Sequence, residues 1–264
     1  MPPTSREQIL QKLESLERAG VTHLPKPRKK PTKVGVPPSG GEAPPQPAVA
    51  AIALPVSPPA PAPLFDPPAA PPIPAAERPT LLEIIQTEVA GCTRCTELAT
   101  TRTQTVFGTG NPSARLMFVG EAPGADEDRQ GKPFVGRAGQ LLTKIIEACR
   151  LTRDEVYIAN VLKCRPPDNR TPLPDEVLNC RGYLDRQIAI IRPEAICCLG
   201  LTAAKALLNT EQSMGRLRGK FHLYSGIPVL CTYHPAYLLR NPAAKRDVWE
   251  DMKTLMRRLG VELG

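Results

Sequence analysis

The residues most able to do chemistry lie in the segment 116–139, LMFVGEAPGADEDRQGKPFVGRAG. A short apolar run here enters a loop rich in glycine and acid, and Phe134 adds one aromatic face. The loop's carboxylates, which could move protons or stabilise a positive charge, are Glu121, Asp126, Glu127 and Asp128. Ligand sites of α/β proteins lie outside the carboxyl ends of strands, and glycines let backbone approach a ligand closely. A glycine-rich surface loop without a ligand is the alternative interpretation.

Two further polar residues come at the ends of apolar runs. Asn160 ends the run 156–160, and His234 follows the run 228–232. The carboxyl ends of parallel strands meet at one edge of a sheet, so we expect Glu121, Asn160 and His234 to lie together. Their carboxylate, carboxamide and imidazole groups would then form one site. A turn-forming asparagine and a histidine that merely satisfies backbone groups are the alternatives.

All eight cysteines lie between residues 92 and 231, which in a cytosolic protein indicates metal ligands and buried thiols rather than disulfides. The candidate ligand set is Cys92, Cys95, Cys164 and Cys180. Four thiolates can hold zinc or an iron–sulfur cluster, and spacing alone does not separate these two. A chain without metal is also open. The other cysteines lie in apolar surroundings and are predicted to be buried thiols: Cys149, Cys197, Cys198 and Cys231.

The elements that must position these residues alternate along the chain. Apolar runs predict strands at 115–119, 156–160, 195–199 and 228–232. Periodicity predicts helices near 80–89, 137–149, 174–191, 202–209 and 244–259. Thr80 and Glu83 form a capping-box pattern at the start of the first helix. The alternation predicts an α/β fold of three α/β/α layers around a central four-stranded parallel sheet, preceded by a disordered proline-rich N-terminal region.

Three regions differ in composition. Residues 1–24 hold a short amphipathic pattern with Ile9, Leu13 and Leu16 on one face, typical of either a docking peptide or a marginal helix. Residues 25–79 contain 19 of the chain's 32 prolines and few aromatics, so we expect a disordered linker. Residues 80–264 are expected to form one globular domain.

Charge and hydropathy limit the possible partners. The chain has 34 Lys and Arg against 26 Asp and Glu, a net charge of +8, which suits a polyanion such as nucleic acid but also fits simple solubility. A basic run near Lys26 and Lys33 would add salt-sensitive phosphate contacts. No apolar run reaches the roughly 18 residues that a membrane helix needs. We therefore expect a soluble cytoplasmic protein of bacterial or archaeal type.

Several motifs together resemble one known family, the family 4 (iron–sulfur) uracil-DNA glycosylases. The matching segments, in order, are GEAPG from Gly120, GKPFVG from Gly131, NVLKCRPP from Asn160 and HPAYLLRNP from His234. The resemblance spans essentially all of residues 80–264 and nothing before them. It implies a monomeric DNA-repair enzyme that flips deoxyuridine out of DNA and hydrolyses its N-glycosidic bond, releasing uracil and leaving an abasic site.

The resemblance also implies roles for individual residues. The four candidate ligands would hold a structural 4Fe–4S cluster. His234 would donate to uracil O2 as negative charge develops there. Asn160 would read the uracil edge and reject cytosine, whose donor and acceptor pattern is inverted, while Phe134 would stack on the base. Glu127 would lie near uracil C5.

The water-handling group departs from the pattern of related glycosylases, which often carry an aspartate just after the strand-one glycine. Ala122 stands near that position and would only line the substrate site. We therefore expect Glu121 and backbone groups to hold the water, with much of the rate coming from electrostatic stabilisation. A second function stays open at this point: a uracil- or DNA-binding or polymerase-associated protein without turnover. A relative that traps the sugar on a histidine carries a histidine-bearing insert that this chain lacks.

The remaining predictions concern DNA and other partners. Leu239 and Arg240, with Leu238, would wedge into the gap left by the extruded base and contact phosphate. Lys163, Arg165 and Arg170 are expected to contact phosphate as well. We expect residues 1–24 to bind a replication or repair protein. The substrate, uracil-containing DNA, is expected in the nucleoid.

Overall fold

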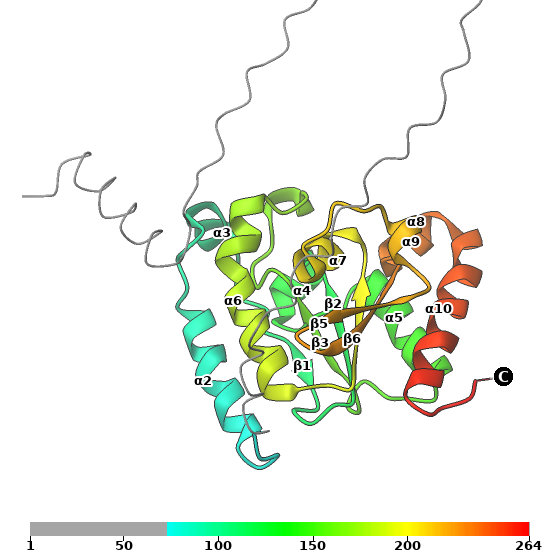
Figure 1. Ribbon diagram of the computed structural model, residues 1–264. Coiled ribbons are helices and arrows are strands. Elements are labelled where there is room, and N and C mark those ends of the chain that lie inside the picture. Colours follow the sequence, from blue (N-terminus) through cyan, green and yellow to red (C-terminus); the bar gives the residue numbers. More distant parts are fainter. Residues whose placement is uncertain (1–72, 264) are drawn as a thin grey trace, which may run out of the picture. The chain divides into compact units, whose positions relative to one another are not determined.

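The computed structural model describes residues 73–263 and contains a six-stranded sheet in the order β1-β3-β2-β4-β6-β5 (Figure 1). The strands are β1 Thr109–Gly110, β2 Leu116–Gly120, β3 Tyr157–Asn160, β4 Ala195–Leu199, β5 Phe221–Tyr224 and β6 Ile227–Thr232. The four central strands are parallel, and the two edge strands are antiparallel to their neighbours. The predicted four-stranded parallel sheet is thus confirmed as the centre of a wider sheet.

The edge strands were missed because they lack the signal of a buried strand. β1 has only two residues, and β5 alternates between exposed and half-buried positions. β5 and β6 form a hairpin through Ser225 and Gly226, whose φ angles are 48° and 77°. Positive φ at both central residues is the geometry of a tight two-residue hairpin turn. The Ser-Gly pair was therefore the available sequence signal.

Helices cover both faces of the sheet. They are α2 Arg78–Ala90, α3 Thr96–Thr101, α4 Ala125–Gln130, α5 Arg137–Ala148, α6 Pro174–Ile191, α7 Leu201–Leu208, α8 Met214–Leu217, α9 Pro235–Arg240 and α10 Lys245–Arg258. Buried side chains of α2, α6 and α7 share one core cluster, while those of α5 and α10 share the other (Figure 1). The three predicted layers are confirmed. The short helices α3, α4, α8 and α9 were not predicted because they are too short to show a period.

Strand side chains alternate between the two cores. In β2, Met117 and Val119 lie in one cluster, whereas Leu116 and Phe118 lie in the other. This alternation follows from the twofold pleat of a strand, and it explains why doubly covered strands read as continuous apolar runs. The four cysteines predicted to be buried thiols, Cys149, Cys197, Cys198 and Cys231, are at most 1% exposed.

The first helix begins earlier than predicted. α2 starts at Arg78 with Pro79 in its first turn, and the predicted capping residue Thr80 lies inside the helix. Proline is favoured at this position because its fixed φ suits the first turn and its missing N–H needs no partner. The Arg78 side chain donates to the carbonyls of Ile73 and Ile191. The folded part therefore extends into the predicted linker 25–79, whose residues before 73, like the helix expected in 1–24, lie outside the described residues.

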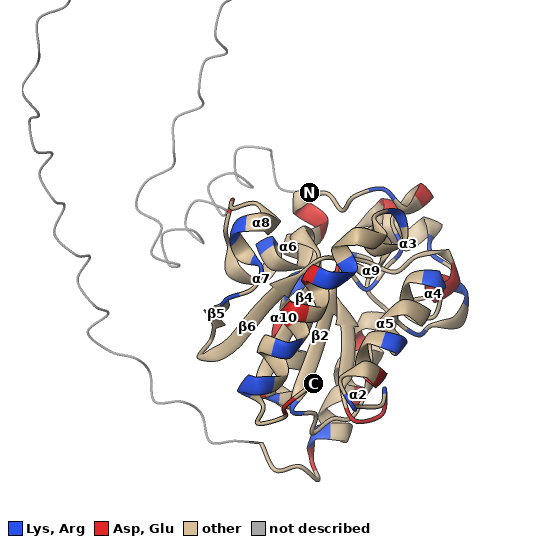
Figure 2. Cartoon of the chain, turned by 90° about the vertical axis from the view of Figure 1, so that its right-hand side faces the viewer, with Lys and Arg blue, Asp and Glu red and all other residues tan. Residues whose placement is uncertain are grey.

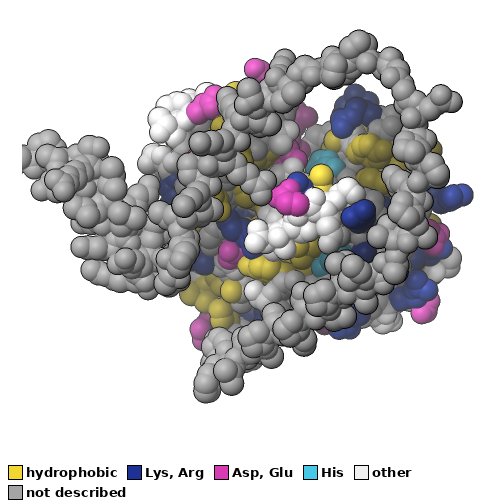
Figure 3. Space-filling model, turned by 45° about the horizontal axis from the view of Figure 1, so that its top comes forward, with side chains coloured by type: hydrophobic (Ala, Val, Ile, Leu, Met, Phe, Trp, Pro, Cys, Tyr) yellow, Lys and Arg dark blue, Asp and Glu magenta, His cyan; other side chains and the backbone are white. Residues whose placement is uncertain are grey.

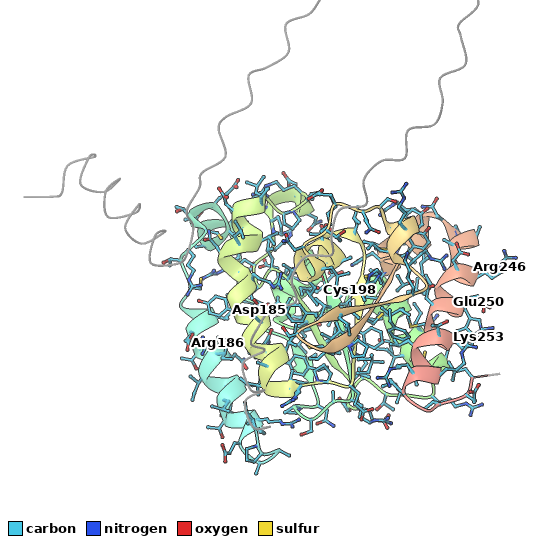
Figure 4. The ribbon with its side chains drawn as sticks, viewed as in Figure 1. Asp185, Arg186, Cys198, Arg246, Glu250 and Lys253 are labelled. Carbon is cyan, nitrogen blue, oxygen red and sulfur yellow. The ribbon has the colours of Figure 1, made fainter. Side chains whose placement is uncertain are left out.

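The last helix confirms its predicted pattern. Val248, Met252, Leu255 and the following Leu259 are all buried. On its outer side lie Arg246, Glu250 and Lys253, as Figure 4 shows, and Figure 2 shows both basic and acidic positions along the ribbon of this helix. Within residues 73–263, no helix combines the length and hydropathy required to cross a membrane.

Candidate functional site

A cavity of about 470 Å³ opens at the carboxyl ends of the parallel strands. Its lining includes all six side chains predicted for catalysis and base binding: Glu121, Ala122, Glu127, Phe134, Asn160 and His234. The predicted convergence of three strand ends is thereby confirmed. Figure 3 brings this end of the molecule forward, where hydrophobic side chains lie close to Lys and Arg side chains on the part that grey atoms leave visible.

Asn160 lies at the end of β3, in register with Gly120 of β2. Its side chain is 2% exposed, and its Oδ1 is the one buried side-chain polar atom in the described residues without a hydrogen-bond partner. Leaving such an atom unpaired costs about 1–3 kcal/mol. The unpaired Oδ1 in the wall of a cavity therefore indicates a ligand that supplies a donor.

Gly120 allows two functional side chains to meet. A Cβ at this position would lie 2.4 Å from Asn160 Oδ1 and 2.5 Å from Phe134 Cζ. Both separations are far below van der Waals contact, so any other residue would displace one of these side chains. The carboxamide and the phenyl ring share the space that glycine leaves empty.

Phe134 is held in a strained turn. Its φ of 54° is left-handed, which costs a non-glycine residue about 1–3 kcal/mol and is typical of functional sites. Arg153 donates to the carbonyls of Pro133 and Phe134 at 2.8 and 3.1 Å and so stabilises the turn. The Phe134 ring is 6% exposed, and its centroid lies 5.5 Å from that of the His234 ring. The two rings therefore form adjoining walls of the cavity.

His234 caps α9, and this local structure determines its tautomer. The ring Nδ1 accepts a hydrogen bond from the backbone N–H of Ala236 at 3.1 Å. A neutral ring that accepts at Nδ1 carries its proton on Nε2, so Nε2–H is the group left to donate. Burial lowers the pKa of His234 to about 4, and the Arg240 charge adds to this effect. The imidazole is therefore a neutral donor at physiological pH.

Glu127 has a structural task that the sequence did not reveal. Its Oε1 accepts from the N–H groups of Val135 and Gly136 at 2.8 and 3.0 Å, and its Oε2 accepts from that of Gly124 at 3.1 Å. One carboxylate thus joins the start of α4 to the turn that carries Phe134. Its position in the cavity wall is observed, and a role beside a bound base stays a prediction.

Glu121 and Ala122 differ in what they can offer a ligand. Glu121 accepts a hydrogen bond through Oε2 from Thr202 Oγ1 of α7, and no described residue occupies its Oε1. Ala122 is partly buried and packs against the core cluster that α2, α6 and α7 share. Glu121 is therefore the carboxylate of this cavity with an oxygen available to a water or a ligand.

The structure contradicts the predicted phosphate contact of Lys163. This side chain is 1% exposed, and its Nζ donates to Asn160 O at 2.9 Å and to Gln187 Oε1 at 2.6 Å. Gln187 donates in turn to Phe107 O and Tyr157 Oη. The ammonium group is enclosed within a buried hydrogen-bond network behind Asn160, so it cannot reach DNA.

Other predicted DNA contacts have mixed outcomes. Leu238 is 1% exposed and packs in the core against α10, so its prediction as a wedge was wrong. Leu239 is 40% exposed, and Arg240 is exposed. Arg165 is half-buried, and among the described residues its side chain hydrogen-bonds only to Asn169. These three remain accessible to a ligand, and their contact with DNA stays a prediction.

The four candidate metal ligands line a second, smaller cavity. Three of the sulfurs accept hydrogen bonds: Cys164 from Arg102 Nη1 at 3.0 Å, Cys180 from Lys163 N at 3.2 Å and Cys95 from Asn179 Nδ2 at 3.6 Å. Such donors are typical surroundings of iron–sulfur ligands. Among the described side chains, no three His, Cys, Asp or Glu are arranged to hold a single metal ion. The four thiols fit an iron–sulfur cluster, because the ligands of a cluster are spread around several metal ions and need not gather at one point.

Two residues were not predicted to line the cavity. Arg170, expected only as a phosphate contact, lines the cavity and forms ion pairs with Glu176 at 2.6 Å and Glu97 at 2.7 Å. Glu97 is 73 residues away in the sequence, so no local pattern could show that pair. Tyr237, in the cavity wall and 38% exposed, is the aromatic residue of the HPAYLLRNP motif and could have been noticed there.

Comparison with known proteins is consistent with this geometry. The sequence model of the Uracil DNA glycosylase superfamily matches residues 107–253. A type-4 uracil-DNA glycosylase of Archaeoglobus fulgidus is 43% identical over 182 residues, which cover 66% of this chain and 91% of the relative. The type-4 enzyme of Thermotoga maritima is 45% identical over 180 residues, covering 67% and 93%. A type-5 uracil-DNA glycosylase of Pyrobaculum aerophilum is 32% identical over 172 residues, covering 59% and 75%.

The state of His234 can be measured by following the imidazole signals with pH in NMR spectra, with His234→Gln to assign the resonance. We expect a pKa near 4, below the usual 6.5. The unfolded chain would then bind a proton between these values that the folded protein does not. This histidine should therefore lower stability as pH falls from about 6.5 to 4. Titration of His234 near 6.5 would contradict the buried neutral ring.

Replacing the buried lysine tests its network. Lys163→Met removes both hydrogen bonds that Nζ donates, so the backbone carbonyl of Asn160 and Oε1 of Gln187 lose this donor. The free energy of unfolding should therefore fall by about 2–4 kcal/mol. Arg165→Met serves as the control, because this half-buried side chain bonds the exposed Asn169 and should change stability by only about 0.5 kcal/mol. Equilibrium unfolding in urea measures both. Equal effects would mean that the Lys163 network adds nothing.

Proposed function

The chain belongs to the type-4 uracil-DNA glycosylases of the uracil DNA glycosylase superfamily, and we propose that its larger cavity is where uracil is cut from DNA. The protein is a DNA-repair hydrolase that breaks the N-glycosidic bond of deoxyuridine. An enzyme of this kind must extrude the nucleotide, because its glycosidic bond is out of reach within the stack. The cavity volume of about 470 Å³ lies in the usual range for small ligands and leaves room for a pyrimidine and its sugar.

The unpaired Oδ1 of Asn160 carries the assignment of the base site. Uracil presents an N3–H donor beside the O4 acceptor, so one carboxamide can accept from the first and donate to the second. Cytosine presents the opposite pattern and would leave buried polar groups unpaired. Phe134 lies beside Asn160 and would cover the face of the base.

His234 would stabilise the departing base. Breaking the glycosidic bond places negative charge on uracil N1 and O2 and positive charge on the sugar. A preorganised donor aimed at O2 lowers the barrier because it need not reorient during the reaction. The hydrogen bond from Ala236 to Nδ1 keeps Nε2–H in the role of donor, and burial keeps the ring neutral.

Glu121 is the proposed partner of the attacking water. Its Oε2 is held by Thr202, which leaves Oε1 to accept a proton from water or to face the cationic sugar. Glu127 is committed to three backbone N–H groups and would act by holding the loop. Ala122 supplies no polar side chain, so the site relies on one free carboxylate.

DNA would be held around the mouth of the cavity. Leu239 is exposed and could occupy the gap that an extruded nucleotide leaves, while Arg240 and Arg165 supply positive charge for phosphates. Residues 1–24 lie outside the described residues, and we propose a replication or repair protein as their partner. We expect a monomer acting on nucleoid DNA in the cytoplasm.

The second cavity is the proposed site of a 4Fe–4S cluster. Cys92, Cys95, Cys164 and Cys180 would hold it, and hydrogen bonds to three of the sulfurs fit such a group. When bound, the cluster would cross-link the segment after α2, the end of β3 and α6, so its role would be structural.

The base site is tested by release of free uracil from an oligonucleotide that contains one deoxyuridine. His234→Ala and Asn160→Asp should each lower kcat by about 10²–10³, the effect of losing one donor to a developing anion. Asn209→Asp, at the exposed end of α7, serves as the control and should match the unmodified enzyme. If the unmodified enzyme binds the oligonucleotide yet leaves no alkali-labile site, the protein is a binding protein and the proposal fails.

The metal site is tested by anaerobic purification followed by iron, sulfide and zinc analysis. We expect about four irons per chain and visible absorbance. Cys180→Ser should lose both, while Cys149→Ser, which changes a buried thiol outside the ligand set, should keep them. A colourless protein with one zinc would contradict the cluster.

A further inference from the structure

Beyond the base site, we propose that Tyr237 forms a stacking subsite for the nucleobase next to the extruded uracil. The inference rests on the proposed function, because it requires a DNA strand at the mouth of the cavity. It concerns a different nucleotide and a side chain to which no role has been assigned above.

The Tyr237 ring is supported from behind. It stacks on the Tyr233 ring with a centroid distance of 4.9 Å and an interplanar angle of 28°. The guanidinium of Arg218 lies 5.3 Å from the Tyr233 ring centroid, and Arg218 is anchored to Asp247 O and Asp251 of α10. Tyr237 is thus the outer member of a fixed series of flat groups. Because the Tyr237 ring is already held in place, a base can stack on it without immobilising a mobile side chain, and this lowers the entropic cost of binding.

The backbone also fixes Tyr237 at the cavity mouth. Its N–H donates to the carbonyl of His234 at 2.8 Å, and the next residue, Leu238, is buried in the core. Tyr237 is nevertheless 38% exposed and lines the same cavity as Asn160 and His234. An aromatic ring in this position is within one or two nucleotides of a base held by Asn160.

The surroundings suit a nucleic-acid strand better than a protein core. Arg240 follows three residues later, is exposed, and makes no ion pair with any described residue. Aromatic rings beside unpaired cations are the usual components of single-strand binding, because every base has a face to stack and a phosphate nearby. Leu239, on the other side of Leu238, would take the place of the extruded base. Tyr237 would then hold the neighbouring base still while the gap is open.

The experiment combines enzyme variants with substrates that lack the neighbouring base. Three single-stranded oligonucleotides carry one deoxyuridine each: one with natural neighbours, one with a tetrahydrofuran abasic residue on the 5′ side, and one with it on the 3′ side. The variants are Tyr237→Phe, which keeps the flat ring, and Tyr237→Leu, which keeps apolar bulk without it. The quantity compared is the ratio of kcat/KM between natural and abasic substrates within one variant, so loss of folded enzyme cancels.

We expect the unmodified enzyme and Tyr237→Phe to lose about 5- to 150-fold in kcat/KM when the base on one side is missing. Tyr237→Leu should be slower on the natural substrate and nearly insensitive to the missing base. Equal sensitivity in all three enzymes, or none in the unmodified enzyme, would overturn the stacking subsite. Failure of the unmodified enzyme to release uracil from any substrate would instead overturn the proposed function.

Discussion

A close approach of three residues organises the larger cavity. Gly120 ends β2, and the space where its Cβ would stand is filled by Asn160 Oδ1 and by the Phe134 ring. Gly139 stands under the turn of Phe134 in the same way, since a Cβ there would lie 1.9 Å from the Phe134 carbonyl oxygen. Asn160 and Phe134, the proposed reader of the base edge and the proposed cover of its face, are therefore positioned by the absence of side chains at two glycines.

The two cavities are joined through a short segment after β3. Lys163 donates from its backbone N–H to Cys180 Sγ and from its Nζ to the Asn160 carbonyl. Arg170 lines the larger cavity and pairs with Glu176, which lines the smaller one. Order at the cysteine site would thus be transmitted to the proposed base site by direct contacts. The proposed cluster would then have a physical purpose close to a DNA site, since it would hold this segment in place.

Sequence reasoning was most successful where burial sets the pattern. The four parallel strands are buried at nearly every position, so their apolar runs and the polar residues that follow them predicted both the sheet and the convergence of Glu121, Asn160 and His234. It failed where tertiary contacts override residue type. Lys163 reads as a surface cation, and only the folded structure supplies the carbonyl and amide oxygens that allow its burial. The three backbone bonds of Glu127 depend on a loop path that no periodicity encodes.

The half-buried, uncharged imidazole of His234 would separate the enzyme's two tasks electrostatically. Arginines around the mouth of the cavity, such as Arg240, attract a polyanion through long-range charge, which dissolved ions screen. Inside it, the neutral His234 ring would act on the proposed substrate through a short dipolar contact. Raising the ionic strength should therefore weaken capture of the strand while leaving the rate of bond breaking in the captured complex nearly constant. Once cleaved, the base would face a neutral imidazole at O2, so it could take up a proton and leave the cavity without an ion pair to His234.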